Sequence, residues 1–107
     1  MQDNRPISQI YAEEGAKWAE AEALASILED TKSAFLAQKI AELGDMAYNR
    51  AEALVKASKE WADRVKETVD ARKQANHRKV RLESIRMAHG EFQSEAANER
   101  HRNRLEQ

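Results

Sequence analysis

The scarcity of chain-breaking residues constrains this fold more than any other feature of the sequence. The 107 residues contain one proline, Pro6, and three glycines, of which only Gly15 lies within residues 7–43. Charged residues make up 35% of the chain. Long solvated helices have this composition, because glycine and proline are the residues that a helix interior tolerates least. The chain is therefore expected to be all-α and, at this length, a single domain.

Apolar residues recur at three- and four-residue steps over residues 7–43, which predicts one long helix after a polar lead at residues 1–6. Pro6 suits the first turn of that helix, where its missing N–H costs nothing. The apolar stripe consists of Tyr11, Trp18, Ala21, Leu24 or Ala25, Leu28, Phe35 and Ile40. Such spacing, sustained over this length, is typical of coiled-coil-like packing.

A break in the periodicity separates this helix from a second one. Gly44 stands where a helix C-terminus needs a left-handed residue, and Asn49, with Glu52 three residues later, matches an N-cap and its capping-box partner. The turn is therefore predicted at residues 44–49. So short a connection makes the two helices antiparallel.

The second helix is predicted over residues 50–89, followed by a polar, frayed helical tail over residues 90–107 that either continues it or forms a short third helix. Gly90 costs a helix only about 1 kcal/mol, so it decides nothing by itself. The expected apolar stripe consists of Leu54, Trp61, Val65, Val69 and Val80, with Thr68, Leu82 and Ile85 beside it. Two helices leave apolar surface uncovered. We therefore expect a homodimer, as a four-helix arrangement to which the C-terminal segment contributes.

Charge is distributed unevenly along the chain. Residues 1–45 hold 4 basic and 9 acidic side chains, whereas residues 46–107 hold 14 basic and 10 acidic ones, which gives the net charge of −1. The densest basic run consists of Arg72, Lys73, Arg78, Lys79, Arg81 and Arg86. In an antiparallel hairpin with its turn near Met46, Arg72 lies near Glu20, and Arg78 and Lys79 lie near Glu13 and Glu14. We expect most of the run to pair with the acidic first helix and to set the register.

The competing interpretation of the basic run is an outward-facing surface for nucleic acid or a protein partner. A second basic cluster in the tail, Arg100, Arg102 and Arg104, lacks an acidic partner in the hairpin and is a further candidate contact, or else a solvated helix end. Arg72 and Asn76 also interrupt the apolar stripe, where they are candidates for a polar layer that fixes register.

The sequence carries no catalytic, cofactor or metal signature. His77, His89 and His101 lie too far apart in angle to share one helix face, and no phosphate loop, nucleophile elbow or HExxH motif is present. We therefore expect a protein that is not an enzyme and needs no cofactor. Without a long apolar run or a signal peptide, we also expect no membrane association and a cytoplasmic location.

Three segments of the sequence, LEDTK (28–32), KASKEW (56–61) and DARKQAN (70–76), carry a resemblance to known proteins. They resemble small uncharacterised helical proteins encoded by tailed bacteriophages and prophages. The resemblance implies a bacterial host cytoplasm and an association with phage DNA metabolism, and it brings no functional residue with it.

These observations support three hypotheses for function. The first is a non-catalytic interaction protein, an adaptor or inhibitor that presents a helical face to an unidentified protein partner. The second is an accessory DNA-binding factor in phage recombination or replication. The third is a virion scaffold or assembly component. Salt-sensitive DNA binding separates the second from the first, and presence in purified virions points to the third.

Overall fold

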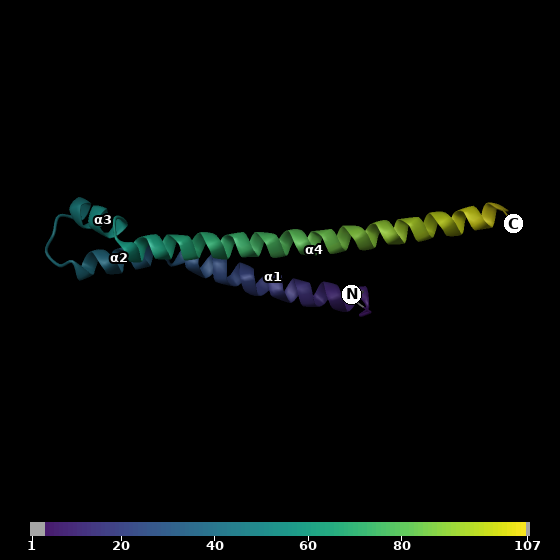
Figure 1. Ribbon diagram of the computed structural model, residues 1–107, viewed down its shortest axis with the longest axis horizontal. Coiled ribbons are helices and arrows are strands. Elements are labelled where there is room, and N and C mark those ends of the chain that lie inside the picture. The colour runs from purple at the N-terminus through teal and green to yellow at the C-terminus, as the bar shows by residue number, and fades with distance from the viewer. Residues whose placement is uncertain (1–3, 107) are drawn as a thin grey trace.

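The computed structural model describes residues 4–106 as an elongated helical hairpin measuring 87 × 23 × 19 Å along its principal axes. Within these residues the helices are α1 (Ile7–Asp30), α2 (Lys32–Glu42), α3 (Tyr48–Lys56) and α4 (Lys59–Glu106). α1 and α2 run in one direction, and α4 returns alongside them (Figure 1). The predicted all-α antiparallel hairpin is therefore confirmed. Part of the predicted polar lead, residues 1–3, lies outside the described residues.

The first predicted helix is interrupted at one residue. Thr31 separates α1 from α2, and its hydroxyl donates a hydrogen bond of 2.6 Å to the carbonyl of Ile27. A threonine that bonds back to the preceding turn loosens and bends a helix without ending it. The backbone N–H of Phe35 still bonds to the carbonyl of Thr31 at 3.0 Å. The long first arm is therefore continuous in direction, although residues 7–43 do not form one regular helix.

The turn between α2 and α3 contains the glycine that the sequence indicated. Gly44 follows the C-cap Leu43 and has φ of +73°, a conformation that L-residues with a side chain adopt only at a cost. The predicted N-cap at Asn49 is wrong. α3 begins at Tyr48 after Ala47, which makes no side-chain cap bond, so Asn49 already lies inside the helix.

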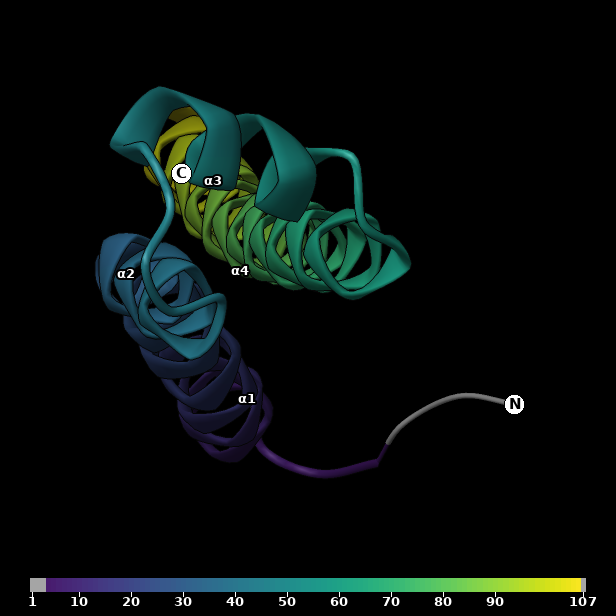
Figure 2. The same ribbon diagram turned by 90° about the vertical axis from the view of Figure 1, so that its left-hand side faces the viewer.

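The second predicted helix is also divided, and the break was not predicted. The backbone N–H of Trp61 donates to the hydroxyl of Ser58 at 3.2 Å, so Ser58 caps the N-terminus of α4. α3 therefore forms a separate short helix at the turn end, where it lies against α2 and the beginning of α4 (Figure 2). α4 then continues through Gly90 to Glu106 as one helix, so the tail extends the second arm and no third C-terminal helix forms.

The seam between α1 and α4 is narrow and rich in alanine. Its buried cluster consists of Ala25, Leu28, Ala71 and Ala75, with Ala21 packed against it. Ala25 and Ala75 are both 0% exposed. Because alanine carries only a methyl group, two such residues are fully covered only where the helices approach closely. Further toward the turn, the rings of Phe35 and Trp61 stack with their centroids 6.3 Å apart.

Part of the predicted α4 stripe does not face the seam. Val69 and Val80 are 59% and 61% exposed, and Leu54 in α3 is 47% exposed. Val65, in the predicted stripe, is half-buried. Buried or half-buried residues of α4 recur with heptad spacing at Trp61, Arg64, Thr68, Ala71, Ala75, Arg78, Leu82, Ile85 and His89. The first arm follows its prediction more closely, because Ala25, and not Leu24, is the buried one of the two alternatives.

Candidate interaction surfaces

Ion pairs cross one side of the seam between α1 and α4. Arg72 donates to Glu22 through Nη1 at 2.7 Å, and to Glu29 through Nε at 2.9 Å and Nη2 at 2.6 Å. The two parallel bonds to Glu29 form the fork geometry that guanidinium and carboxylate groups favour. The hydrogen bond from Arg72 lowers the pKa of the Glu29 carboxyl, and the same carboxylate raises the pKa of the guanidinium. The charged side chains on this side of the seam are therefore already paired with one another.

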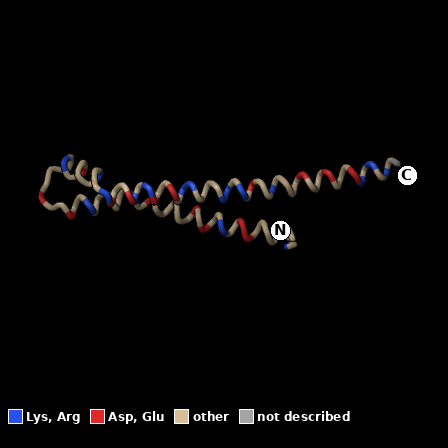
Figure 3. Tube along the Cα trace, viewed as in Figure 1, with Lys and Arg blue, Asp and Glu red and all other residues tan. Residues whose placement is uncertain are grey.

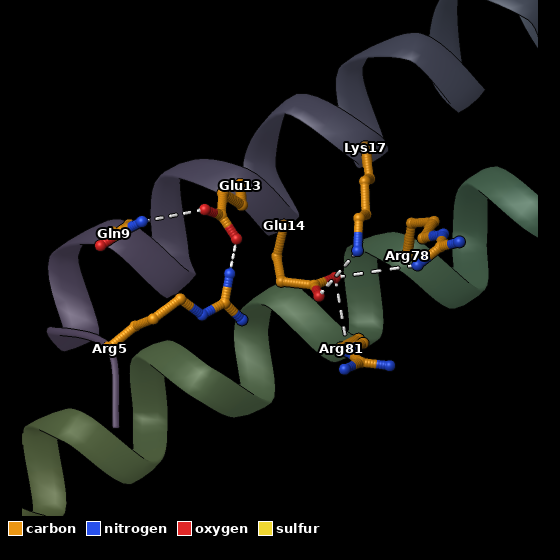
Figure 4. Close-up of polar contacts among 7 residues, drawn as sticks. All are labelled: Arg5, Gln9, Glu13, Glu14, Lys17, Arg78 and Arg81. Carbon is orange, nitrogen blue, oxygen red and sulfur yellow. Dashed lines mark hydrogen bonds and ion pairs between the residues drawn. The ribbon is translucent and has the colours of Figure 1, made fainter. Parts of the chain in front are cut away.

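A second charge cluster lies near the open end of the hairpin, around Glu14 (Figure 4). The Glu14 side chain points from α1 toward α4 and is only 6% exposed. Its carboxylate oxygens lie 3.5 Å from Lys17 Nζ, 3.8 Å from Arg78 Nη1 and 3.4 Å from Arg81 Nε. Three cations offset the charge of a carboxylate that the helix interface removes from water, although Glu14 Oε2 accepts no hydrogen bond within residues 4–106.

Of the six bases in the run, three pair with carboxylates of the first helix, namely Arg72, Arg78 and Arg81. Arg78 meets the predicted Glu14, and Arg72 meets Glu22 close to the predicted Glu20. The remaining members of the run, Lys73, Lys79 and Arg86, make no ion pair within residues 4–106. In the tail, Arg100 bonds the carbonyl of Ala96 at 3.3 Å in its own helix, and Arg102 and Arg104 have no ion pair in the described part of the chain.

The predicted polar layer at Arg72 and Asn76 is wrong. Asn76 is exposed, and the Arg72 side chain lies at the edge of the seam with 31% of its surface exposed. Among the described residues, the buried polar side chains are those of Glu14 and Thr68. Thr68 satisfies its hydroxyl by donating 2.8 Å to the carbonyl of Arg64. Glu14 lies seven residues before Ala21, and this heptad spacing was the sequence signal for its burial in the seam. The signal was missed because the acidic residues of the first helix were interpreted as solvated.

The opposite side of the seam is open. A groove of about 410 Å³ runs between α1 and α4, with Ala21, Leu24, Leu28 and Ala71 among its lining residues. Leu24 is 53% exposed, and Ile27, one turn further along α1, is 59% exposed. The α4 wall of the groove consists of Asp63, Lys66, Glu67, Asp70 and Gln74. We call this surface the open groove.

The charge of the open groove differs from that of the basic run. Asp63, Glu67 and Asp70 outnumber Lys66, and none of the four forms an ion pair within residues 4–106. The groove therefore combines apolar side chains, contributed mostly by α1, with an acidic wall contributed by α4. This combination suits a ligand that carries an apolar stripe beside positive charge.

Residues 4–106 contain no cluster of three histidine, cysteine or acidic side chains arranged to hold a metal ion. No helix in the same part of the chain is long and apolar enough to cross a membrane. His89 is half-buried on the seam line, whereas His77 and His101 are exposed, so the three histidines do not converge.

The fold and its surfaces define an all-α hairpin with one side closed by ion pairs and the other open. Comparisons with protein-family models, curated proteins and solved structures find no match to the chain.

Proposed function

We propose that the protein is a non-catalytic interaction module, an adaptor or inhibitor, whose open groove receives an amphipathic helix of a partner protein. The observation that supports this most directly is the exposure of Leu24 and Ile27 beside a groove whose floor is Ala21, Leu28 and Ala71. An apolar groove between two helices is a common receptor for a third helix that lays its apolar face into it.

The acidic wall indicates the chemistry of the partner helix. Lysine or arginine residues flanking its apolar stripe can pair with Asp63, Glu67 and Asp70. The opposite side of the seam offers no comparable site, because Arg72 already joins Glu22 and Glu29 across it. The proposed partner is therefore a basic amphipathic helix, and the resemblance to phage proteins makes a bacterial host protein the first place to look for one.

The test uses affinity capture from host cytoplasm together with a photo-crosslinking side chain placed in the groove. Leu24→Asp introduces a charge among the apolar lining and should abolish capture. Val80→Asp makes a matched change at a similarly exposed apolar residue of α4 outside the groove, and it should leave capture intact. The crosslinked peptide should be a helix with basic residues beside its apolar face. Capture that is equally sensitive to both variants, or a crosslinked segment without positive charge, would refute the proposal.

DNA binding is the second candidate function, because Lys73, Lys79 and Arg86 have no ion pair in the described part of the chain. Only part of the basic run is available for it, since Arg72, Arg78 and Arg81 engage carboxylates of α1. If DNA is bound, the logarithm of the affinity should fall with the logarithm of salt concentration by about 0.7–0.9 per phosphate contacted. Such binding, weakened by Lys79→Ala and not by Leu24→Asp, would place this candidate first. Recovery of the protein from purified virions would instead favour a scaffold or assembly role.

A further inference from the structure

The heptad-spaced positions of α4 that face the seam continue past the last residues that α1 covers. Ile85 and His89 lie with Ile7 and Tyr11 around a cavity of about 400 Å³ at the start of α1. Past His89, α4 extends alone (Figure 1). The same heptad spacing leads to Phe92, Ala96, Glu99 and Asn103, and Phe92 is 68% exposed. We call residues 90–106 of α4 the overhang.

We propose that the overhang pairs antiparallel with the overhang of a second copy of this chain, which joins two hairpins end to end. The register places Ala96 against Glu99 of the second copy, and Phe92 against Asn103 of the second copy. Each layer pairs one of the two seam positions of the heptad, held by Ala96 and Asn103, with the other, held by Phe92 and Glu99. Antiparallel coiled coils pair their seam positions in this way. The two-fold axis passes between Ala97 and Asn98, so every paired layer lies beyond the end of α1.

Charge complementarity supports this register. The acidic residues Glu91, Glu95 and Glu99 come first along the overhang, and Arg100, Arg102 and Arg104 follow (Figure 3). Because an antiparallel partner runs the other way, its basic end lies along the acidic end of the first copy. Glu95 and Arg102 both flank the seam, and neither has an ion pair within residues 4–106. In the proposed dimer they face each other across the interface twice, once on each side of the axis.

Neighbouring registers place like charges together. A shift of one heptad in one direction brings Glu95 opposite its own copy and Arg86 opposite Arg100 of the second chain. A shift in the other direction brings Arg100 and Arg102 each opposite its own copy. Like charges in direct opposition disfavour an alternative pairing. The sequence of the overhang therefore favours one antiparallel register.

A parallel arrangement fits less well for two reasons. It stacks Glu99 on its own copy within the seam, where a pair of carboxylates lacks compensating charge. It also places both hairpins at the same end, where α1 of each chain already occupies the seam beside Ile85 and His89. The antiparallel pairing places Glu99 against Ala96 and not against its own copy, and the two hairpins project in opposite directions.

Sedimentation equilibrium and small-angle X-ray scattering of the full chain test the proposal. One chain is 87 Å long. Overlap of the overhangs removes roughly 25 Å at about 1.5 Å per residue, so the dimer should have a maximum dimension of about 150 Å. A compact four-helix dimer would be much shorter. A monomer at millimolar concentration, or a dimer no longer than one chain, would overturn the proposal.

Charge reversal tests the register. Glu95→Arg converts two attractions per dimer into two repulsions, and it should raise the dimer Kd by about tenfold, as exposed pairs contribute modestly but here act twice. Arg102→Glu should do the same, and the double variant E95R/R102E should restore the Kd to near the starting value. Glu91→Arg makes the same charge change at a position that points away from the seam, and it serves as the control. Failure of the double variant to recover dimerisation would refute the register.

Orientation is read from disulfides, since the chain has no native cysteine. A mixture of Phe92→Cys and Asn103→Cys proteins should form the mixed disulfide on mild oxidation. Phe92→Cys alone should not crosslink, because the antiparallel register separates the two introduced thiols by 11 residues of helix, roughly 16 Å. A homodimeric Phe92→Cys disulfide would show parallel pairing and would overturn the proposal. The exposed overhang is remote from the hairpin core, so circular dichroism of each variant should report unchanged helicity of the arms.

Discussion

Substitution of Ala75 by leucine tests whether the alanine seam is a close-packed contact. Sequence pattern alone predicts stabilisation, because leucine is the common seam residue in coiled coils and each buried methylene contributes about 0.8 kcal/mol. The structure predicts the opposite. Ala75 is 0% exposed and packs in one cluster with Ala25, also 0% exposed, so a larger side chain must push α1 and α4 apart.

We therefore expect Ala75→Leu to lower the free energy of unfolding by about 1–3 kcal/mol, the usual cost of overpacking. For a chain of this size, that cost corresponds to a fall in Tm of roughly 5–20 °C. Thermal and urea unfolding followed by circular dichroism at one fixed protein concentration measure it, because association would make Tm depend on concentration.

The control is Ala62→Leu, the same substitution at an exposed position of α4. It should change stability by no more than about 0.5 kcal/mol in either direction. A higher Tm for Ala75→Leu than for the unsubstituted chain would show that the seam has room, and the close-approach argument would then be wrong.

Four further outcomes follow from individual residues. The hydrogen bond from Arg72 lowers the pKa of Glu29 in the folded chain. This ion pair therefore stabilises the fold fully above the ordinary carboxyl pKa of 4.5, and the stabilisation is lost as the pH falls through the lowered pKa. In unfolding curves measured against pH, Glu29→Gln should reduce the loss of unfolding free energy that the unsubstituted chain shows in acid. Gly44→Ala should destabilise the chain by about 1–2 kcal/mol, because φ is +73° although the space is open. Gly90→Ala should instead slow amide exchange in the surrounding turns of α4, since helical alanine is favoured over glycine by about 1 kcal/mol. Ser58→Ala removes the cap of α4 and should cost about 1 kcal/mol in urea unfolding.

The sequence by itself determined the helical class, the antiparallel path and the position of the glycine turn. These follow from local chemistry: few residues break helices, and Gly44 meets the need for a left-handed residue after α2. The charge layout also determined that Arg72 and Arg78 meet acidic residues of α1, because facing positions in a hairpin follow from the position of the turn.

Only the tertiary structure decided which residues enter the seam. An alanine-rich helix presents several faces of similar apolarity, so spacing alone favoured Val80, whereas the structure buries Ala75 and leaves Val80 61% exposed. Burial of Glu14 was equally invisible in the sequence, since it depends on Arg78 and Arg81 arriving from α4. The selection depends on how closely α1 approaches α4, and small side chains at the contact set that distance. A contact across two helices has no local signal, because each helix satisfies its own backbone whichever face it turns inward.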